Sequence, residues 1–328
     1  MSFQFVRASN AAAAARFKSS SDGAMFIAGG SGVVDLLSQN VIRPSLLIDL
    51  TGLSNRGIDL TPQGALCVGA LTTMAQLAWH ENVMTDYPVL MQALLSGATP
   101  QVHHAASIGG NLLQKTRCTY YRNSGFACNK RNPGSGCDAR NGFNAGHAIF
   151  GASEHCIAVH PSDLAVALLA LNAEITLEGR NGKRSLPMDD LLRLPGDTPH
   201  LESSLAQDEL IVSVEIPRLS RNTRSAYSKV DEHNSFSFAV VSVAAVVEIQ
   251  NGLVSNARLA AGGVAPKPWR LASTEAAILH NELNEKTIEN AALAAIQGAI
   301  ALAHNAHKVE LLKRTVTGIL TQLAGHQS

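Results

Sequence analysis

Apolar positions along the first 55 residues alternate between the spacing of short strands and the spacing of helices. We expect a strand at residues 3–6, followed by an alanine-rich helix that Ser9 or Asn10 caps. The segments AMFIAGG, GVVDLLSQN and SLLIDLTGL then predict a strand, a helix and another strand. This alternation indicates a compact α/β unit over residues 1 to about 55.

The pattern is looser between residue 56 and about residue 218. ALCVGAL, AEITLEG and ELIVSVEIP predict strands, whereas TMAQLAWHENV, YPVLMQALLSGA and the apolar part of HPSDLAVALLAL favour helices. A polar, basic and proline-limited stretch, PRLSRNTRSA, then marks a boundary between domains.

Beyond that boundary, AYSKV, FAVVSVAAVVEIQ and LVSNARLAAGGV predict three strands, and the turn QNG joins the last two. The apolar spacing from residue 273 onward is near 3.6 and predicts two or three helices. Strands in meanders, with helices grouped apart, favour an α+β fold over a doubly wound parallel sheet. We expect two domains, residues 1–218 and 219–328, with the first divided into subdomains of about 1–55 and 56–218.

Composition and charge exclude several functional classes. The chain is 46% hydrophobic and 16% charged with a formal net charge of zero, so no bulk attraction to nucleic acid or to anionic membranes is expected. No stretch approaches the roughly 18 apolar residues that a membrane span needs. The N-terminal residues have neither the apolar region nor the twin arginines of a secretion signal, which predicts synthesis in the cytoplasm. Five cysteines are not expected to form a disulfide framework in that reducing compartment.

The first candidate binding element is the glycine turn in FIAGGSGVVDLL, between a predicted strand and a predicted helix. Gly29, Gly30 and Gly32 leave the backbone N–H groups open to a ligand, and the helix N-terminus favours a phosphate or pyrophosphate. Asp35 stands where the dinucleotide fingerprint needs its third glycine, which argues against a Rossmann site. The turn by itself is equally well explained as structural.

Two further segments extend this outline. ASIGGNLLQ offers small side chains and backbone donors about eighty residues later, and HPSDLAVALLAL places Ser162 and Asp163 at the start of a helix. Spacing alone favours Asp163 as a helix N-cap, with ligand binding as the alternative. Together, the two turns and the polar cap indicate a site for an extended, phosphate-bearing ligand.

A loop over about residues 114–156 carries four cysteines with nine, eight and eighteen residues between them: Cys118, Cys128, Cys137 and Cys156. Structural zinc sites usually begin with a close pair, and none exists here. The spacing is not that of compact ferredoxins either, so spacing alone does not decide between zinc and an iron–sulfur cluster. Four thiolates suit a cluster. Six basic residues against one acid between positions 115 and 140 would surround an anionic cluster with positive charge and favour its reduced state.

The remaining cysteine and the histidines have ordinary interpretations. Cys67 lies at an alternating position in ALCVGAL and is expected in the core. We expect packing or capping roles for most of the histidines. A mixed Cys/His zinc site is the alternative for the pair near Cys156, and contact with the bound ligand is the alternative for the pair at positions 103 and 104. The pairs are His103 and His104 in a loop, His155 and His160 near Cys156, and His304 and His307 on a predicted helix surface.

The motifs FIAGGSGVVDLL, ASIGGNLL, HPSDLAVALLAL, ELIVSVEIP and AGGVAPKPWR occur in the order seen in FAD-binding subunits of molybdenum hydroxylases. The chain resembles this xanthine dehydrogenase and aldehyde oxidoreductase family over essentially its whole length. With the cysteine loop included, it resembles the flavin and iron–sulfur subunit of bacterial periplasmic aldehyde oxidase. Hydroxybenzoyl-CoA reductase also has a cysteine-bearing insertion in its flavin subunit.

The resemblance implies a fold of the vanillyl-alcohol-oxidase (PCMH) type, in which two α/β subdomains hold FAD between them. It also implies a C-terminal domain of a three-stranded antiparallel sheet and helices, like that of CO dehydrogenase flavoproteins, with Trp269 packed between the domains. FAD contacts are implied at Ile27, Ala28, Gly29, Gly30, Ser31, Gly32, Val33 and Val34, at Ser107, Gly109, Gly110 and Asn111, and at Asp163, Ile211 and Lys229. From the residues alone, Lys229 is equally well a solvated lysine at a strand edge. A 4Fe–4S cluster is implied at Cys118, Cys128, Cys137 and Cys156.

The resemblance therefore implies an oxidoreductase: an electron-transfer subunit of a heterotrimer. Partners would be a molybdopterin-binding large subunit and a small subunit with 2Fe–2S clusters, and electrons would leave FAD for an external acceptor. No catalytic acid or base is expected in this chain. The alternatives are a hydroxybenzoyl-CoA-reductase-like flavin subunit, a self-contained flavin oxidase and a non-catalytic zinc-binding scaffold. Residence is expected in the cytoplasm, or in the periplasm after co-export with a signal-bearing partner.

Overall fold

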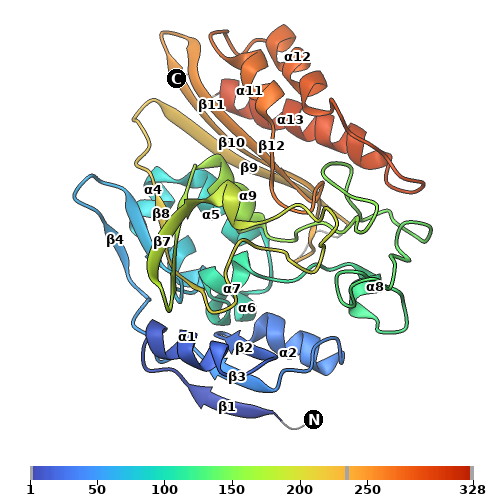
Figure 1. Ribbon diagram of the computed structural model, residues 1–328. Helices are drawn as coiled ribbons and strands as arrows, with labels where there is room; N and C mark the ends of the chain where they lie inside the picture. Colours follow the sequence, from blue (N-terminus) through green and yellow to red (C-terminus); the bar gives the residue numbers. More distant parts are fainter. Residues whose placement is uncertain (1–2, 233–235, 326–328) are drawn as a thin grey trace.

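The computed structural model describes residues 3–232 and 236–325, which form three sheets with helices packed on them (Figure 1). The N-terminal unit is a parallel sheet of order β1-β3-β2. Asn10 caps its first helix, where the side chain accepts a hydrogen bond from the Ala13 N–H at 2.8 Å, as one of the two expected caps. The elements are β1 (Gln4–Arg7), α1 (Ala11–Ser19), β2 (Ala24–Ile27), α2 (Ser31–Ser38) and β3 (Leu46–Asp49).

The second unit is an antiparallel sheet of order β4-β5-β8-β6-β7, with several short helices between its strands. Its strands are β4 (Ile58–Leu60), β5 (Leu66–Gly69), β6 (Glu174–Gly179), β7 (Gly182–Pro187) and β8 (Leu210–Ile216). Its helices are α3 (Met74–Ala78), α4 (Glu81–Asp86), α5 (Pro88–Ser96), α6 (Pro100–Ala105), α7 (Ile108–Leu112), α8 (Thr119–Arg122), α9 (Asp163–Ala170) and α10 (Met188–Leu191).

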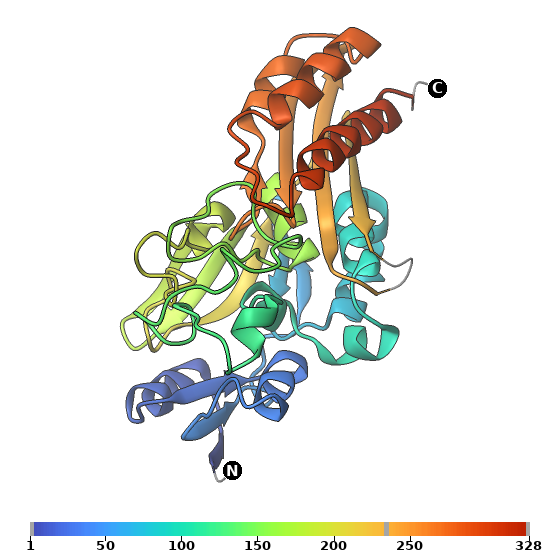
Figure 2. The same cartoon turned by 90° about the vertical axis from the view of Figure 1, so that its right-hand side faces the viewer.

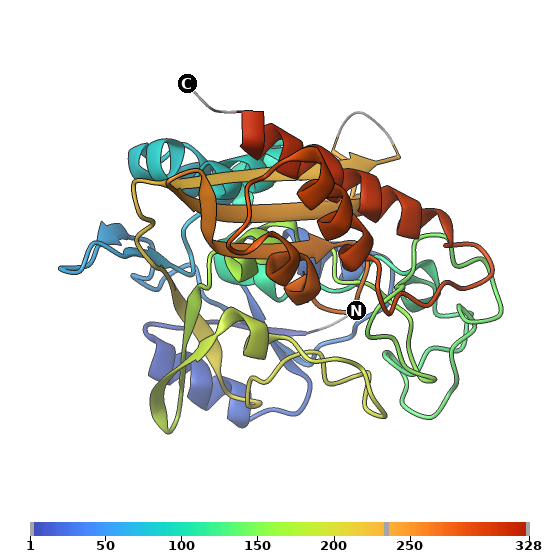
Figure 3. The same ribbon diagram turned by 90° about the horizontal axis from the view of Figure 1, so that it is seen from above.

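The third unit is an antiparallel sheet of order β12-β11-β10-β9, and the helices at the C-terminal end of the chain cover one of its faces (Figure 3). The three expected strands are present. A short fourth strand joins them, because Trp269, which directly follows a proline, pairs with Ala261. The elements are β9 (Thr223–Asp231), β10 (Ala239–Gln250), β11 (Leu253–Gly262), β12 (Trp269–Arg270), α11 (Ala272–Ile278), α12 (Glu285–Ala295) and α13 (His307–Gly325).

Helix α9 lies at the centre of the molecule. All eight of its residues are buried, and it packs against α5 on one side and against β10 and β11 on the other. The continuous apolar run of this segment therefore reflects a helix covered all round. Its N-terminus is held where the units meet.

The cysteine loop lies beside the sheets, with α8 as its one helix among the residues described (Figure 2). Its end is fixed by the chain just before α13 and by the start of that helix. Asn305 donates to the carbonyl oxygens of His147 and Ala148, and the buried Lys308 donates to that of Gly146 at 2.9 Å. Phe150 also stacks on Trp269 with ring centroids 5.3 Å apart, which is the packing expected of Trp269 between the two domains.

Candidate functional site

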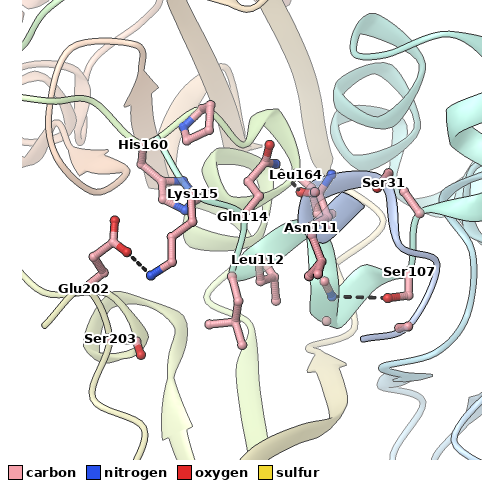
Figure 4. Close-up of a pocket in the computed structure, with 18 of the residues that line it drawn as sticks. Ser31, Ser107, Asn111, Leu112, Gln114, Lys115, His160, Leu164, Glu202 and Ser203 are labelled. Carbon is pink, nitrogen blue, oxygen red and sulfur yellow. Dashed lines mark hydrogen bonds and ion pairs between the residues drawn. The ribbon is translucent and has the colours of Figure 1, made fainter. Parts of the chain in front are cut away.

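A cavity of about 750 Å³ lies where the N-terminal unit, the central unit and the cysteine loop meet. Figure 4 shows part of its lining, with Ser31 from α2, Ser107 and Asn111 around α7, and Lys115 from the start of the loop. Of the fifteen residues that we expected to contact FAD, those that line the cavity are Ala28, Gly29, Gly30, Ser31, Gly32, Val33, Ser107, Gly109, Gly110, Asn111, Asp163 and Ile211.

Three expected contacts lie outside the lining. Ile27 ends β2, and the side chain of Val34 faces outward on α2 with the residue 56% exposed. Lys229 is turned toward the interior, and its side chain is 5% exposed. The alternative of a solvated lysine at a strand edge is therefore wrong, because this side chain is held by an ion pair inside the protein.

The first glycine turn has a conformation that larger residues do not adopt easily. Gly30 has a φ of +78° at the N-cap position of α2, in the left-handed region. A Cβ atom at Gly29 would overlap the carbonyl oxygen of Ala105 at the end of α6. No side chain caps the N-terminus of α2, so its first N–H groups face the cavity edge with the positive end of the helix dipole.

The second glycine turn packs against the central sheet. Gly109 donates to the carbonyl of Ala70, and a Cβ there would lie 3.1 Å from the Ala70 side chain. Ser107 caps α7 by accepting from the Gly110 N–H at 3.2 Å. The two turns lie next to each other at one cavity, because Gly29 contacts the end of α6 and α7 follows directly.

Asp163 is the first residue of α9, and Ser162 is its N-cap, with its hydroxyl oxygen accepting from the Ala165 N–H at 3.0 Å. The expectation that Asp163 caps this helix is therefore wrong. Its carboxylate accepts from the Tyr227 hydroxyl at 2.6 Å and pairs with Lys229 at 3.0 Å. Burial raises the pKa of Asp163, and the Lys229 charge opposes that rise.

Two clusters of ion pairs lie at the cavity, and their position there was not predicted from the sequence. Asp35 of α2 pairs with Arg117 at 3.0 Å and with Arg122 at 2.6 Å. Glu202 pairs with both Lys115 and Lys130. Four of the six basic residues that we assigned to the surroundings of a cluster therefore line the large cavity. The cluster of basic residues is visible in the sequence, but the sequence does not show toward which cavity the loop turns them.

His160 also lines the cavity, although a packing or capping role was expected. Its Nδ1 accepts from the Ser162 N–H at 3.4 Å, whereas its buried Nε2 has no hydrogen-bond partner among the described residues. Burial lowers its pKa to about 4, so the ring is neutral near pH 7. His103 and His104 do not line this cavity, and the ring of His103 bonds the Gly97 carbonyl.

The four loop cysteines, Cys118, Cys128, Cys137 and Cys156, line one smaller cavity. None of the five cysteines of the chain is in a disulfide. Burial raises the pKa of the Cys118 thiol to about 11, and it also raises the pKa of Cys137 and of Cys156. Across residues 3–232 and 236–325, no group of three or more His, Cys, Asp or Glu side chains is arranged to hold a metal ion.

Cys67 lies apart from that cavity, on β5. It is half-buried, while its neighbours Leu66 and Val68 are fully buried. The expectation of a core cysteine is wrong, because strand alternation turns Cys67 to the opposite, partly solvated face. It offers a control thiol for experiments on the loop. His304 and His307 are both exposed as expected, but His304 precedes α13.

The geometry thus provides two glycine turns, a buried polar helix start and basic side chains around one cavity. In the part of the chain that the structure describes, no helix is long and apolar enough to span a bilayer. The sequence matches the family described as "FAD binding domain in molybdopterin dehydrogenase" over residues 1–219. Residues 225–324 match the "CO dehydrogenase flavoprotein C-terminal domain".

Individual proteins agree with these matches. The aldehyde oxidoreductase FAD-binding subunit PaoB of Escherichia coli is 41% identical over 98% of both chains. The 6-hydroxypseudooxynicotine dehydrogenase complex subunit alpha of Paenarthrobacter nicotinovorans is 29% identical over 84% of this chain and 77% of its own. Carbon monoxide dehydrogenase from Hydrogenophaga pseudoflava has a similar fold, with a TM-score of 0.78 at 23% identity over 98% of this chain and 97% of that one. The chain belongs to the family of FAD-binding subunits of the molybdopterin dehydrogenases.

Proposed function

We propose that this chain is the electron-transfer subunit of a heterotrimeric molybdenum hydroxylase of the aldehyde or xanthine dehydrogenase type. A large subunit would bind molybdopterin and oxidise the substrate, and a small subunit would deliver electrons through 2Fe–2S clusters. The names of the relatives support this assignment, since they include FAD-binding and medium subunits of aldehyde, xanthine and carbon monoxide dehydrogenases. Residues 1–218 would form the FAD-binding domain and residues 219–328 the C-terminal domain.

The observation that carries the proposal is the cavity of about 750 Å³ that both glycine turns line. Its donor chemistry fits FAD: open N–H groups at the start of α2 suit the pyrophosphate, and Gly109 and Ile211 provide a close, apolar wall. When bound, FAD accepts and releases electrons singly or in pairs. The protein's part is to hold and orient this group, and no side chain acts as a general acid or base on the substrate.

The finer part of the proposal is a 4Fe–4S cluster held by Cys118, Cys128, Cys137 and Cys156. Its support is that four thiols, free of disulfides, line one small cavity. A cluster gives each of four thiolates its own iron, and soft sulfur ligands suit iron–sulfur chemistry.

Anaerobic purification of the chain tests both parts. We expect flavin absorption, a broad iron–sulfur shoulder, and about four irons and four sulfides per chain. A protein without flavin would overturn the main proposal, and flavin with zinc in place of iron would overturn the cluster alone. Oxidation of an aldehyde by the isolated chain would instead favour a self-contained flavin oxidase.

The ligand assignment has its own matched test. Cys128→Ser should remove the cluster signal while FAD binding largely survives, because the glycine turns lie outside the loop. Cys67→Ser is the control, since Cys67 lies on β5 away from the smaller cavity, and it should keep full iron content. Retention of iron in Cys128→Ser would show that the assigned ligands are wrong.

Location is a further proposal. The chain would be made in the cytoplasm and either stay there or reach the periplasm folded, together with a signal-bearing partner. Fractionation of cells that express the whole complex, with immunodetection of this chain, distinguishes the two compartments.

A further inference from the structure

The large cavity and the cysteine cavity share part of their lining. Lys130 and Ala158 contribute to both, whereas Lys115 and Glu202 line the large cavity only. Lys130 comes from the cysteine loop itself, two residues after Cys128, and Ala158 lies two residues after Cys156. The partition between the two cavities is therefore thin, and its one charged side chain among the described residues is Lys130.

Lys130 is held firmly in this partition. Its side chain is 10% exposed, and its ammonium group donates to Glu202 and to the Pro199 carbonyl, both at 3.0 Å. The same carboxylate accepts from Lys115, which extends toward it from the large-cavity side (Figure 4). Two ammonium groups share one carboxylate, so this set carries a net charge of +1.

The field of these charges reaches both sides. Lys130 lines the cysteine cavity together with the four loop cysteines, so its charge lies beside the loop sulfurs. On the other side, the two lysines hold the pKa of Glu202 below its ordinary value against the effect of burial. Charges with little solvent around them are screened weakly, so their effect extends across a thin partition.

We propose that Lys130 is a tuning residue shared by both redox groups of this chain and raises the reduction potential of each. Lys115 acts from the flavin side, and Glu202 opposes both lysines. The inference rests on the proposed function, because it requires FAD in the large cavity and a cluster at the four cysteines. Adding an electron to either group adds one negative charge beside a fixed positive one, which stabilises the reduced form.

Potentiometric titration of the loaded protein tests this, with flavin followed by absorbance and the cluster by electron paramagnetic resonance. Lys130→Met should make both midpoint potentials more negative, by at least threefold in each one-electron equilibrium constant (about 28 mV, from 59 mV per tenfold). Lys115→Met should move the flavin potential more than that of the cluster. Glu202→Gln should move both potentials in the opposite direction, and Lys130→Arg should restore them because it keeps the charge.

Unchanged potentials in Lys130→Met, with both groups bound, would overturn the inference and leave the proposed function intact. If Lys130 has a purely structural role, Lys130→Met should lower the flavin or iron content but leave the reduction potentials of the loaded fraction unaltered. That result would also overturn the inference. Wild-type protein without iron would instead remove the cluster half of the proposed function. If Lys130→Met does not fold, the opposite shifts of Lys115→Met and Glu202→Gln decide the sign.

Discussion

The ammonium nitrogen of Lys229 lies 3.0 Å from a carboxylate oxygen of Asp163, and the two side chains are 5% and 9% exposed. This pair joins β9 of the C-terminal sheet to the start of α9. Lys229 also donates to the Ser96 carbonyl at the end of α5, and Tyr227 completes the set with its hydroxyl bond to Asp163. Three elements are thus fixed by one buried charge pair whose carboxylate belongs to a residue that lines the cavity.

Lys229→Met should destabilise the chain by about 3 kcal/mol, because it leaves the buried Asp163 carboxylate without its counter-charge. Burial already raises the pKa of Asp163, and loss of the lysine raises it further. The folded variant then binds a proton at Asp163 that the unfolded chain releases. The loss of stability relative to the wild type should therefore shrink as the pH falls toward the pKa of an aspartate in the unfolded chain. Urea titrations followed by tryptophan fluorescence measure this effect. Recovery of stability in Lys229→Met/Asp163→Asn is the expected control result.

Gly29→Ala and Gly32→Ala separate two reasons for a glycine in the first turn. At Gly29 a Cβ meets the Ala105 backbone, so the variant should lose both stability and FAD binding. At Gly32 a Cβ would meet nothing within 4 Å beyond its chain neighbours and the backbone of its own helix, so the FAD-free protein should melt like the wild type. Weaker FAD binding by Gly32→Ala, measured by flavin fluorescence, would then report close approach of the ligand to the turn. Equal FAD affinity of both variants and the wild type would contradict this account.

Asp35→Asn should loosen the connection between α2 and the cysteine loop. Arg117 and Arg122 both lose their carboxylate, and we expect a loss of about 1 kcal/mol together with faster amide exchange over residues 116–123. The exposed pair Glu310 and Arg314 on α13 is the matched control. Glu310→Gln should change neither stability nor exchange in the loop, and a similar effect of both variants would argue against a specific role of Asp35.

Lys308 should make stability depend on pH above neutrality. Burial lowers its pKa to about 7, whereas the unfolded lysine titrates near 10.4. Between these values the unfolded chain binds more protons, so stability rises with pH, by about 1 kcal/mol per unit. The difference between wild type and Lys308→Met in urea titrations at pH 7.5, 8.5 and 9.5 isolates this effect. A difference that stays constant would mean that Lys308 remains charged when folded.

Local pattern predicts much of this fold, because most elements bury one face or all faces. The α9 segment and the three long strands of the C-terminal sheet have enough apolar residues to be recognised. Asn10 marks the start of α1, because asparagine is a common N-cap residue. Strand β7 was missed because it is an exposed edge, with Leu186 its one buried residue. Strand β12 was missed because two residues after a proline have no period to detect.

The site was harder to predict from the sequence, because it depends on which side chains from different units point into the same cavity. The glycine turns were found because a backbone conformation or close approach imposes glycine there. Arg117 and Lys130 could be counted as basic but not placed, because their partners Asp35 and Glu202 lie more than seventy positions away. Lys308 is hidden for the same reason, since its burial follows from contacts with Gly146 and Gly263, which lie 162 and 45 positions away.

The bonds from Asn305 and Lys308 to the end of the cysteine loop join positions 157 to 162 residues apart. During synthesis the loop leaves the ribosome long before those two residues exist, since chains fold progressively from the N-terminus. The four thiols therefore lie in a loop that lacks these contacts while about half of the chain is still being made. Docking of α13 is what closes this segment, so a cluster of the kind proposed above would have to be delivered before that helix docks.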